Sequence, residues 1–425
     1  TEWGEPLNFD GKNSEHVREF YRANARDGIE EFHLDGLRLD ATQSIFDVSD
    51  VHILAEIARE VREAARGRET LLVAENEPQH TRLVRTPERG GYGLDSLWND
   101  DFHHSAMVAM TGRNEAYYTD HMGRPQELIS AVKYGYLFQG QRYKWQRQRR
   151  GTPAFDLAPT AFVNFIQNHD QVANSAHGKR VHLLTSPGRY RAITALMLLA
   201  PSIPMLFQGQ EFASSAPFFY FADYEPELAG KVRRGRKEFL AQFRGIGTKE
   251  ARDYLIDPEA TETFERCKLD FSEREANENI YEMHRDLIRL RREDAVFAAQ
   301  RKGGVDGAVL GTEAFVLRFF GDDGDDRLLL VNLGADLNLN PAPEPLLAPP
   351  EDSVWTIHWS SEDCRYGGTG TPPLETKINW RLPGHAAIAM RPAPAGETYD
   401  AARGGDEPSE EEETRREGLE AWKRE

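Results

Sequence analysis

The feature that most constrains the fold of this chain is where its polar residues fall relative to short apolar runs. Helix-like spacing of apolar residues covers residues 14–32, 51–66 and 189–200, and short apolar stretches occupy residues 33–40, 70–74, 94–98, 161–167 and 202–207. Alternating strands and helices predict parallel strands joined by crossover helices. Charged or amide residues follow each apolar stretch, namely Asp40, Glu75, Asn99 to Asp101, Asn168 to Asp170, and Gln208 to Glu211. Because the ends of barrel strands converge on one rim, this pattern predicts a (β/α)8 barrel with its active site there.

A second pattern begins at about residue 300. Short alternating apolar runs at 314–320, 327–332, 354–359 and 385–390 are separated by Gly and Pro clusters, which predicts an antiparallel β-sandwich domain. No glycine-rich phosphate loop follows the earlier strands, so a nucleotide-binding sheet is disfavoured. We expect a catalytic barrel portion over residues 1–296, the β-domain over 297–392, and an acidic, disordered tail over 393–425.

Charge and composition limit the partners. The chain carries 52 Lys and Arg against 70 Asp and Glu, a net charge of −18, so it lacks the basic surface that binds nucleic acid. The sequence contains no apolar run long enough to span a membrane. Its two cysteines, Cys267 and Cys364, are far apart and form no disulfide framework, which favours a cytoplasmic location. An uncharged ligand fits this composition best.

Three carboxylates at strand ends carry the predicted chemistry. Arg38 and Asp40 point to the same side of a strand, so the guanidinium can hold the carboxylate ionised. Glu75 leaves an apolar strand, where desolvation raises a carboxyl pKa toward that of a general acid. Asp170 stands beside His169. Two carboxylates with these roles, and a third that binds sugar hydroxyls, are what cleavage of a glycosidic bond requires.

Two other interpretations of these residues stand beside this one. A single Asp at a strand end usually caps a helix or lies in a solvated turn, an explanation that weakens when three occur together. His103 and His104 could bind a metal with Asp100 and Asp101, but adjacent histidines on a strand point to opposite sides. We therefore predict no metal and no cofactor.

The motifs that contain these residues resemble a known family. Residues 35–41 (DGLRLDA), 73–77 (VAENE) and 165–170 (FIQNHD) resemble three signature regions of the α-amylase family of glycoside hydrolases, in the right order, and residues 202–211 (SIPMLFQGQE) resemble its eighth-strand motif. Within that family, the sequence resembles the malto-oligosyltrehalose trehalohydrolases in particular. This resemblance lies in residues 98–104, 135–141, 149–153, 168–174 and 218–223.

This resemblance implies roles for individual residues. Asp40 would be the nucleophile of a retaining mechanism, Glu75 the general acid and base, and Asp170 a ligand of sugar hydroxyls that helps to distort the ring. Carboxyl groups about 5–5.5 Å apart are typical of retaining enzymes. The implied substrate is maltooligosyltrehalose or a related α-1,4-glucan, cut next to the trehalose end to release trehalose. A functional pairing with a maltooligosyltrehalose synthase is also implied, without a known physical complex.

Further residues are expected to bind substrate. They are Arg38, Gln43, Trp98, Asp101, His103, His104, Asn168, His169, Gln171 and Asn174. Trp98 is expected to stack on a pyranose ring. Asp101, His103 and His104 match a stretch that faces the trehalose unit in the family. Gln43 stands near the position where the family commonly has a histidine, and its amide can still bind a sugar.

The resemblance begins at what would be the fourth barrel strand. We therefore expect three strands and an N-terminal β-sandwich of the family to be missing from this sequence, and expect little or no activity from the chain alone. Two alternatives remain open: another α-glucan enzyme, such as a branching enzyme, and an inactive glucan-binding fragment.

Overall fold

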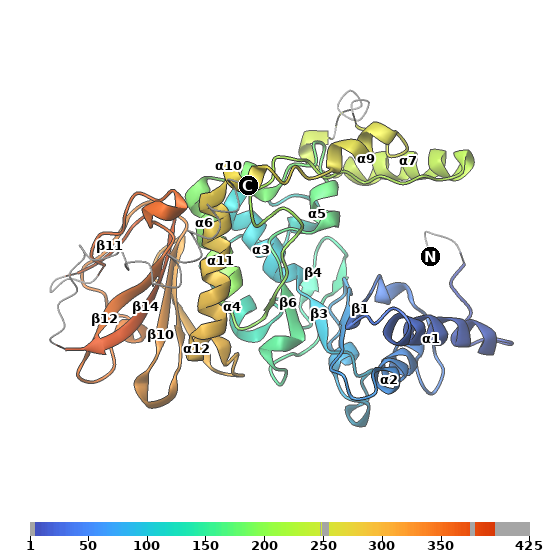
Figure 1. Ribbon diagram of the computed structural model, residues 1–425, viewed down its shortest axis with the longest axis horizontal. Helices are drawn as coiled ribbons and strands as arrows, with labels where there is room; N and C mark the ends of the chain where they lie inside the picture. Colours follow the sequence, from blue (N-terminus) through green and yellow to red (C-terminus); the bar gives the residue numbers. More distant parts are fainter. Residues whose placement is uncertain (1–4, 247, 249–254, 375–378, 396–425) are drawn as a thin grey trace, which may run out of the picture.

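A computed structural model of the chain describes residues 5–246, 248, 255–374 and 379–395. Its first part is an open parallel sheet with the strand order β1 (Gly36–Leu39), β2 (Leu71–Ala74), β3 (Ser96–Trp98), β6 (Phe162–Asn164) and β7 (Ile203–Pro204). Each strand lies within a predicted apolar run. The sequential order of neighbouring strands is that of a barrel, and it confirms the expected partial barrel (Figure 1).

Helices and further loops surround this sheet. The helices are α1 (Glu15–Glu30), α2 (Ile53–Ala65), α3 (Asp100–Thr111), α4 (Pro125–Tyr134), α5 (His169–Ala173), α6 (Pro187–Leu199), α7 (Pro226–Leu240), α9 (Thr261–Cys267), α10 (Glu273–Ala276), α11 (Glu278–Glu293) and α12 (Ala295–Ala298). A short hairpin, β4 (Arg142–Tyr143) and β5 (Gln148–Arg149), lies between α4 and β6.

The two faces of the parallel sheet have different surroundings. Leu72 and Ala74 belong to a core shared with Ile29 of α1 and Ile57 of α2. Val73 instead joins a second cluster with Trp98 and its neighbours on the other face. This is the alternation that a strand imposes on successive side chains. Arg38 and Glu75 lie on this second side of their strands, so their side chains point away from the helices.

The second part of the molecule consists of two antiparallel sheets. The larger has the order β12 (Ser353–Ser360), β14 (Ala386–Pro394), β10 (Arg327–Asn332), β9 (Ala314–Phe319) and β8 (Val305–Val309), and the smaller pairs β11 (Leu337–Leu339) with β13 (Trp380–Leu382). Leu330, Ile388 and Leu382 bring both sheets into one core, which confirms the predicted β-sandwich. The boundary after residue 296 stays a prediction. The tail was expected to begin at residue 393, but β14 continues to Pro394, and the expected tail from residue 396 onward lies outside the described residues.

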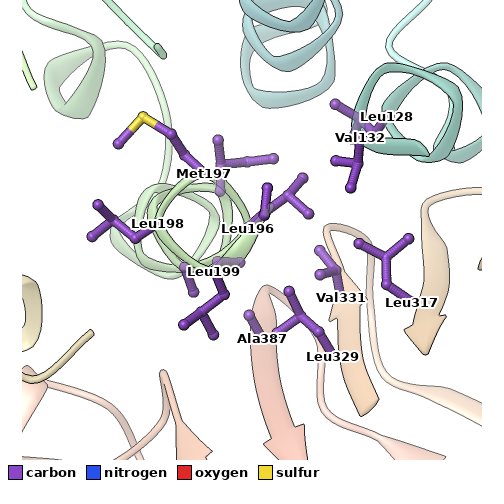
Figure 2. Close-up of a cluster of buried hydrophobic side chains, with 14 of the residues drawn as sticks. Leu128, Val132, Leu196, Met197, Leu198, Leu199, Leu317, Leu329, Val331 and Ala387 are labelled. Carbon is purple, nitrogen blue, oxygen red and sulfur yellow. The ribbon is translucent and has the colours of Figure 1, made fainter. Parts of the chain in front are cut away.

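A continuous core joins the two parts. Figure 2 shows Leu196 and Leu199 of α6 against Leu329 and Val331 of β10, with Leu317, Ala387, Leu128 and Val132 beside them. Leu196, Leu199, Leu329 and Val331 are fully buried. At the same seam, Arg191 of α6 forms a buried ion pair with Glu362, at 2.6 Å. The β-domain is thus packed against the barrel helices and supports the sheet that carries the site.

Truncation of Leu329 to alanine is expected to lower the free energy of unfolding by about 2–5 kcal/mol, because it removes buried methyl groups and leaves a cavity at the seam. Urea unfolding followed by tryptophan fluorescence measures the loss. Val354→Ala is the matched control, since Val354 is 36% exposed on β12 and should cost much less. Equal costs for the two substitutions would contradict the seam as a shared core.

Candidate active site

The ends of β1 and β2 bring Asp40 and Glu75 to the same part of the rim. The Glu75 backbone N–H donates to Leu39 O at 2.9 Å, and the Thr42 N–H donates to Glu75 O at 3.0 Å. Ala41 adopts a left-handed conformation, with φ of 43°, and its N–H donates to Glu75 Oε2 at 2.6 Å. The turn after β1 therefore fixes the Glu75 carboxylate beside the residue that follows Asp40.

Arg38 organises the other side of this pair. Its Nη1 lies 2.6 Å from Asp40 Oδ1, and its guanidinium lies 4.2 Å from the centre of the Trp98 ring. The Trp98 face and the Asp40 carboxylate thus hold the guanidinium together. The side chain of Asp40 is 72% exposed, so it remains open to a ligand.

Burial raises the pKa of Glu75 above its ordinary value, as the sequence analysis predicts. The nearby carboxylates of Asp40 and Asp170 act in the same direction, whereas the Ala41 N–H and the Arg38 guanidinium oppose it. The direction of the shift shows that desolvation outweighs the two groups that favour the ionised form. Glu75 is accordingly suited to hold a proton that a leaving group could take.

The end of β6 supplies Asp170 and its neighbours. Asn168 caps α5 by accepting a hydrogen bond from the Gln171 N–H at 2.8 Å. His169 Nε2 lies 3.4 Å from Asp170 Oδ2, and the His169 ring lies 6.1 Å from that of Trp98. Asp170 and His169 are both about half exposed. The structure thus gathers the three predicted carboxylates, Arg38, Trp98 and His169 at one rim.

Three residues expected to touch the sugar are placed elsewhere, and this is a correction. Asp101, His103 and His104 lie buried within α3 and contact protein groups. His103 stacks on Phe165 at 5.3 Å, and burial lowers its pKa to about 3, so its imidazole is neutral at pH 7. The physical reason is that the strand ends at Trp98 and a helix begins at Asp100, which turns these side chains inward.

The remaining expected sugar contacts, Gln43, Gln171 and Asn174, lie in two different places. Gln43 lies in the turn after β1, and its buried Oε1 has no hydrogen-bond partner among the described residues. Gln171 and Asn174 line a cavity of about 600 Å³ beside α5, where Gln171 Oε1 accepts a hydrogen bond from Tyr118 at 3.2 Å.

Arg236 of α7 is a residue that the sequence analysis did not find. Its Nη1 lies 3.4 Å from Asn174 Oδ1, and its guanidinium lies 4.5 Å from the Tyr220 ring. Arg236 is far from Asp170 in the sequence, and no motif around Arg236 indicates that it belongs to the site.

Within the described ranges, no three His, Cys, Asp or Glu side chains are grouped so that they could hold a metal ion. The same part of the chain contains no helix with the length and apolarity needed to cross a bilayer.

Comparison with known proteins gives several relatives. Residues 302–388 match a family described as a domain of unknown function, DUF3459. Malto-oligosyltrehalose trehalohydrolase of Deinococcus radiodurans is 37% identical over 342 residues, which cover 79% of this chain and 54% of the relative. The enzyme of the same name from Saccharolobus solfataricus is 35% identical and covers 72% of this chain and 51% of its own length. The chain therefore spans about half the length of the curated relatives it matches.

A solved structure shares the fold. The putative alpha amylase from Salmonella typhimurium superposes with a TM-score of 0.73 and 29% identity, over 89% of this chain and 60% of that protein. More distantly, a 1,4-alpha-glucan branching enzyme from Leifsonia xyli is 29% identical over 239 residues, which cover 50% of this chain and 28% of the relative.

Proposed function

We propose that this chain, which belongs to the α-amylase family of glycoside hydrolases, carries the catalytic carboxylates of a malto-oligosyltrehalose trehalohydrolase. The reaction is hydrolysis of the α-1,4 bond next to the trehalose end of maltooligosyltrehalose, with release of trehalose. The observation that carries this proposal is the partly buried Glu75, held by the Ala41 N–H beside the ion pair of Arg38 and Asp40. The names of the relatives support the choice of substrate.

The proposed mechanism assigns one role to each carboxylate. Asp40 attacks the anomeric carbon and forms a covalent glycosyl ester, while Glu75 gives its proton to the departing glycosidic oxygen. The ionised Glu75 then takes a proton from water, whose oxygen attacks the anomeric carbon and releases Asp40. Arg38 holds and orients the Asp40 carboxylate through the contact at 2.6 Å. Because the anomeric configuration is inverted twice, it is retained.

The other rim residues would bind the sugar. Asp170 and His169 are exposed enough to accept hydrogen bonds from hydroxyl groups, and Asn168 holds the start of α5 that presents them. We propose that Gln171 and Asn174 extend this contact into the cavity beside α5. Trp98, which was expected to stack on a pyranose ring, is only 7% exposed and contacts the Arg38 guanidinium, so its support of the site runs through Arg38. An enzyme that builds trehalose ends on maltooligosaccharides would have to supply the substrate.

The test is a comparison of products from two substrates. The chain is incubated with maltotriosyltrehalose and, in parallel, with maltopentaose, and the products are separated by chromatography. The described strands carry all three carboxylates, so, in place of the earlier expectation of little or no activity, we expect free trehalose from the first and almost no product from the second. Formation of α-1,6 branches from amylose would instead indicate a branching enzyme. Glucan binding without any product would indicate a binding fragment, and the absence of both binding and product would overturn the proposal.

A further inference from the structure

Asp100 is a carboxylate at the rim to which the proposed mechanism gives no role. It is the first residue of α3 and follows Trp98 by two positions. Its side chain is 15% exposed, and no other described residue donates a hydrogen bond to its carboxylate. A largely buried carboxylate normally receives hydrogen bonds, because leaving it without them costs free energy.

The neighbouring Asp101 has the opposite environment. Both of its oxygens are used, since Oδ2 accepts the Phe138 N–H at 2.7 Å and Oδ1 accepts Arg150 Nε at 3.2 Å. Its side chain is fully buried. Asp101 therefore has a structural role, and of the two adjacent carboxylates only that of Asp100 is open to a ligand.

Arg150 stands behind Asp100. Its Nη2 lies 3.8 Å from Asp100 Oδ2, too far for a hydrogen bond, and this nitrogen is buried without a hydrogen-bond partner among the described residues. The guanidinium itself is fixed by Asp101 and by the Tyr143 ring at 4.8 Å. Arg150 thus supplies a fixed positive charge near Asp100 and leaves the acceptor sites of the carboxylate unoccupied.

The register of the sheet places Asp100 close to the proposed catalytic acid. Ala74 pairs with Leu97, so Glu75 is level with Trp98 at the end of β3, and Asp100 begins α3 two residues later. Neighbouring strands are about 4.8 Å apart. Burial raises the pKa of Asp100 to about 7, with smaller contributions in the same direction from Glu75 and Glu77 and an opposing one from Arg150.

We propose that Asp100 binds a hydroxyl group of the glucan beside Glu75, with Arg150 as the residue that positions it. This inference rests on the proposed function and names a further substrate contact of the same site. An uncharged polyol is the ligand chemistry that fits. Glu75 and Glu77 disfavour an anion, and the fixed guanidinium of Arg150 disfavours a cation. The hydroxyl would complete the hydrogen bonding that the protein leaves unfilled.

The experiment measures the Kd of maltotriosyltrehalose by calorimetry for the chain and for two variants. Asp100→Ala is expected to weaken binding about ten-fold or more, because a hydrogen bond between the glucan and a largely desolvated carboxyl group is lost. Asp100→Asn keeps the size and one acceptor oxygen, so we expect an intermediate loss of roughly three-fold. Asp223→Asn is the control, since Asp223 is exposed and lies outside the site, and its Kd should not change.

Thermal melting separates binding from a structural role. Both Asp100 variants should melt at or above the temperature of the parent chain, because each removes a buried carboxylate with no hydrogen-bond donor. Asp101→Asn should melt lower, because it weakens the pair with Arg150. Unchanged affinity in Asp100→Asn and Asp100→Ala, with binding intact in the parent, would overturn this inference alone. Absence of binding in the parent would overturn the proposed function and this inference together.

Discussion

Replacing Glu75 with glutamine is expected to lower the turnover of maltotriosyltrehalose by roughly three orders of magnitude, the usual size of a general acid–base contribution. Glutamine fills the same space and can still accept the Ala41 N–H, but it has no proton to give to the leaving oxygen. The Kd of the substrate should therefore change only a few-fold. Steady-state rates from released trehalose, together with calorimetric binding, measure the two quantities separately.

The raised pKa of Glu75 also predicts the direction in which activity and stability change with pH. Because the pKa of Glu75 is raised, the parent should lose activity as the pH rises through that value and the acid becomes ionised. The same shift affects stability. The protonated form is favoured in the folded state, so this stabilisation is present below the unfolded pKa, about 4.3, and is lost as the pH rises through the folded pKa. Glu75→Gln should thus raise the melting temperature at pH 7 and have less effect near pH 4.

A matched control is available in the same strand unit. Glu69 is an exposed glutamate that precedes β2 at its opposite end, and Glu69→Gln should leave both the rate and the melting temperature unchanged. Turnover in Glu75→Gln that equals the parent would exclude Glu75 as the acid. A rate loss accompanied by an equal loss of affinity would instead assign it a role in binding.

The sequence predicted the strands and the carboxylates because both are local consequences of burial. The run before Glu75 is apolar because β2 is covered on one face by helices and on the other by the Trp98 cluster, and desolvation on this second face raises the pKa of Glu75. The side shared by Arg38 and Asp40 follows from the two-residue period of a strand. Such features need no knowledge of distant contacts, so a single sequence is enough to predict them.

The misplaced contacts at α3 have an identifiable cause. The strand period does not continue past Trp98, because Asn99 caps a helix by accepting the Phe102 N–H. An Asn followed by two acidic residues, with Phe102, Ala106 and Met110 at spacings of four, is a helix start that the sequence does contain. Recognising it would have placed Asp101 inside the fold. It would not have shown that Asp100 lacks hydrogen-bond donors, because that depends on the three-dimensional position of Arg150.

Residues that act through distant contacts could not be predicted. Arg150 reaches Asp101 across 49 positions of the chain, and Arg236 reaches Asn174 across 62. Arg149 and Arg150 are adjacent and chemically identical in the sequence, yet the first is exposed and the second is 1% exposed. Only the fold of the hairpin formed by β4 and β5 distinguishes them.

That difference leads to a second prediction with a large effect. Arg150→Met is expected to lower the free energy of unfolding by about 3–5 kcal/mol, the usual cost of removing one partner of a buried ion pair. Methionine has a similar length, but it leaves the Asp101 carboxylate buried without its cation. The Phe138 N–H would remain the single hydrogen-bond donor to that carboxylate among the described residues. Chemical denaturation monitored by circular dichroism gives the loss.

Arg149→Met is the matched control. Among the described residues, the exposed Arg149 side chain donates only a long hydrogen bond to Gly140 O, at 3.4 Å, and its loss should cost no more than about 0.5 kcal/mol. Adding Asp101→Asn to Arg150→Met removes the unpaired charge and keeps an acceptor for the Phe138 N–H. We therefore expect the double variant to recover much of the lost stability. Equal costs for the two arginines, or no recovery in the double variant, would mean that the fold at this rim does not depend on the buried pair. Recovery of stability without recovery of glucan affinity would separate the two roles of Arg150, since the pair with Asp101 maintains the fold and the charge behind Asp100 serves the ligand.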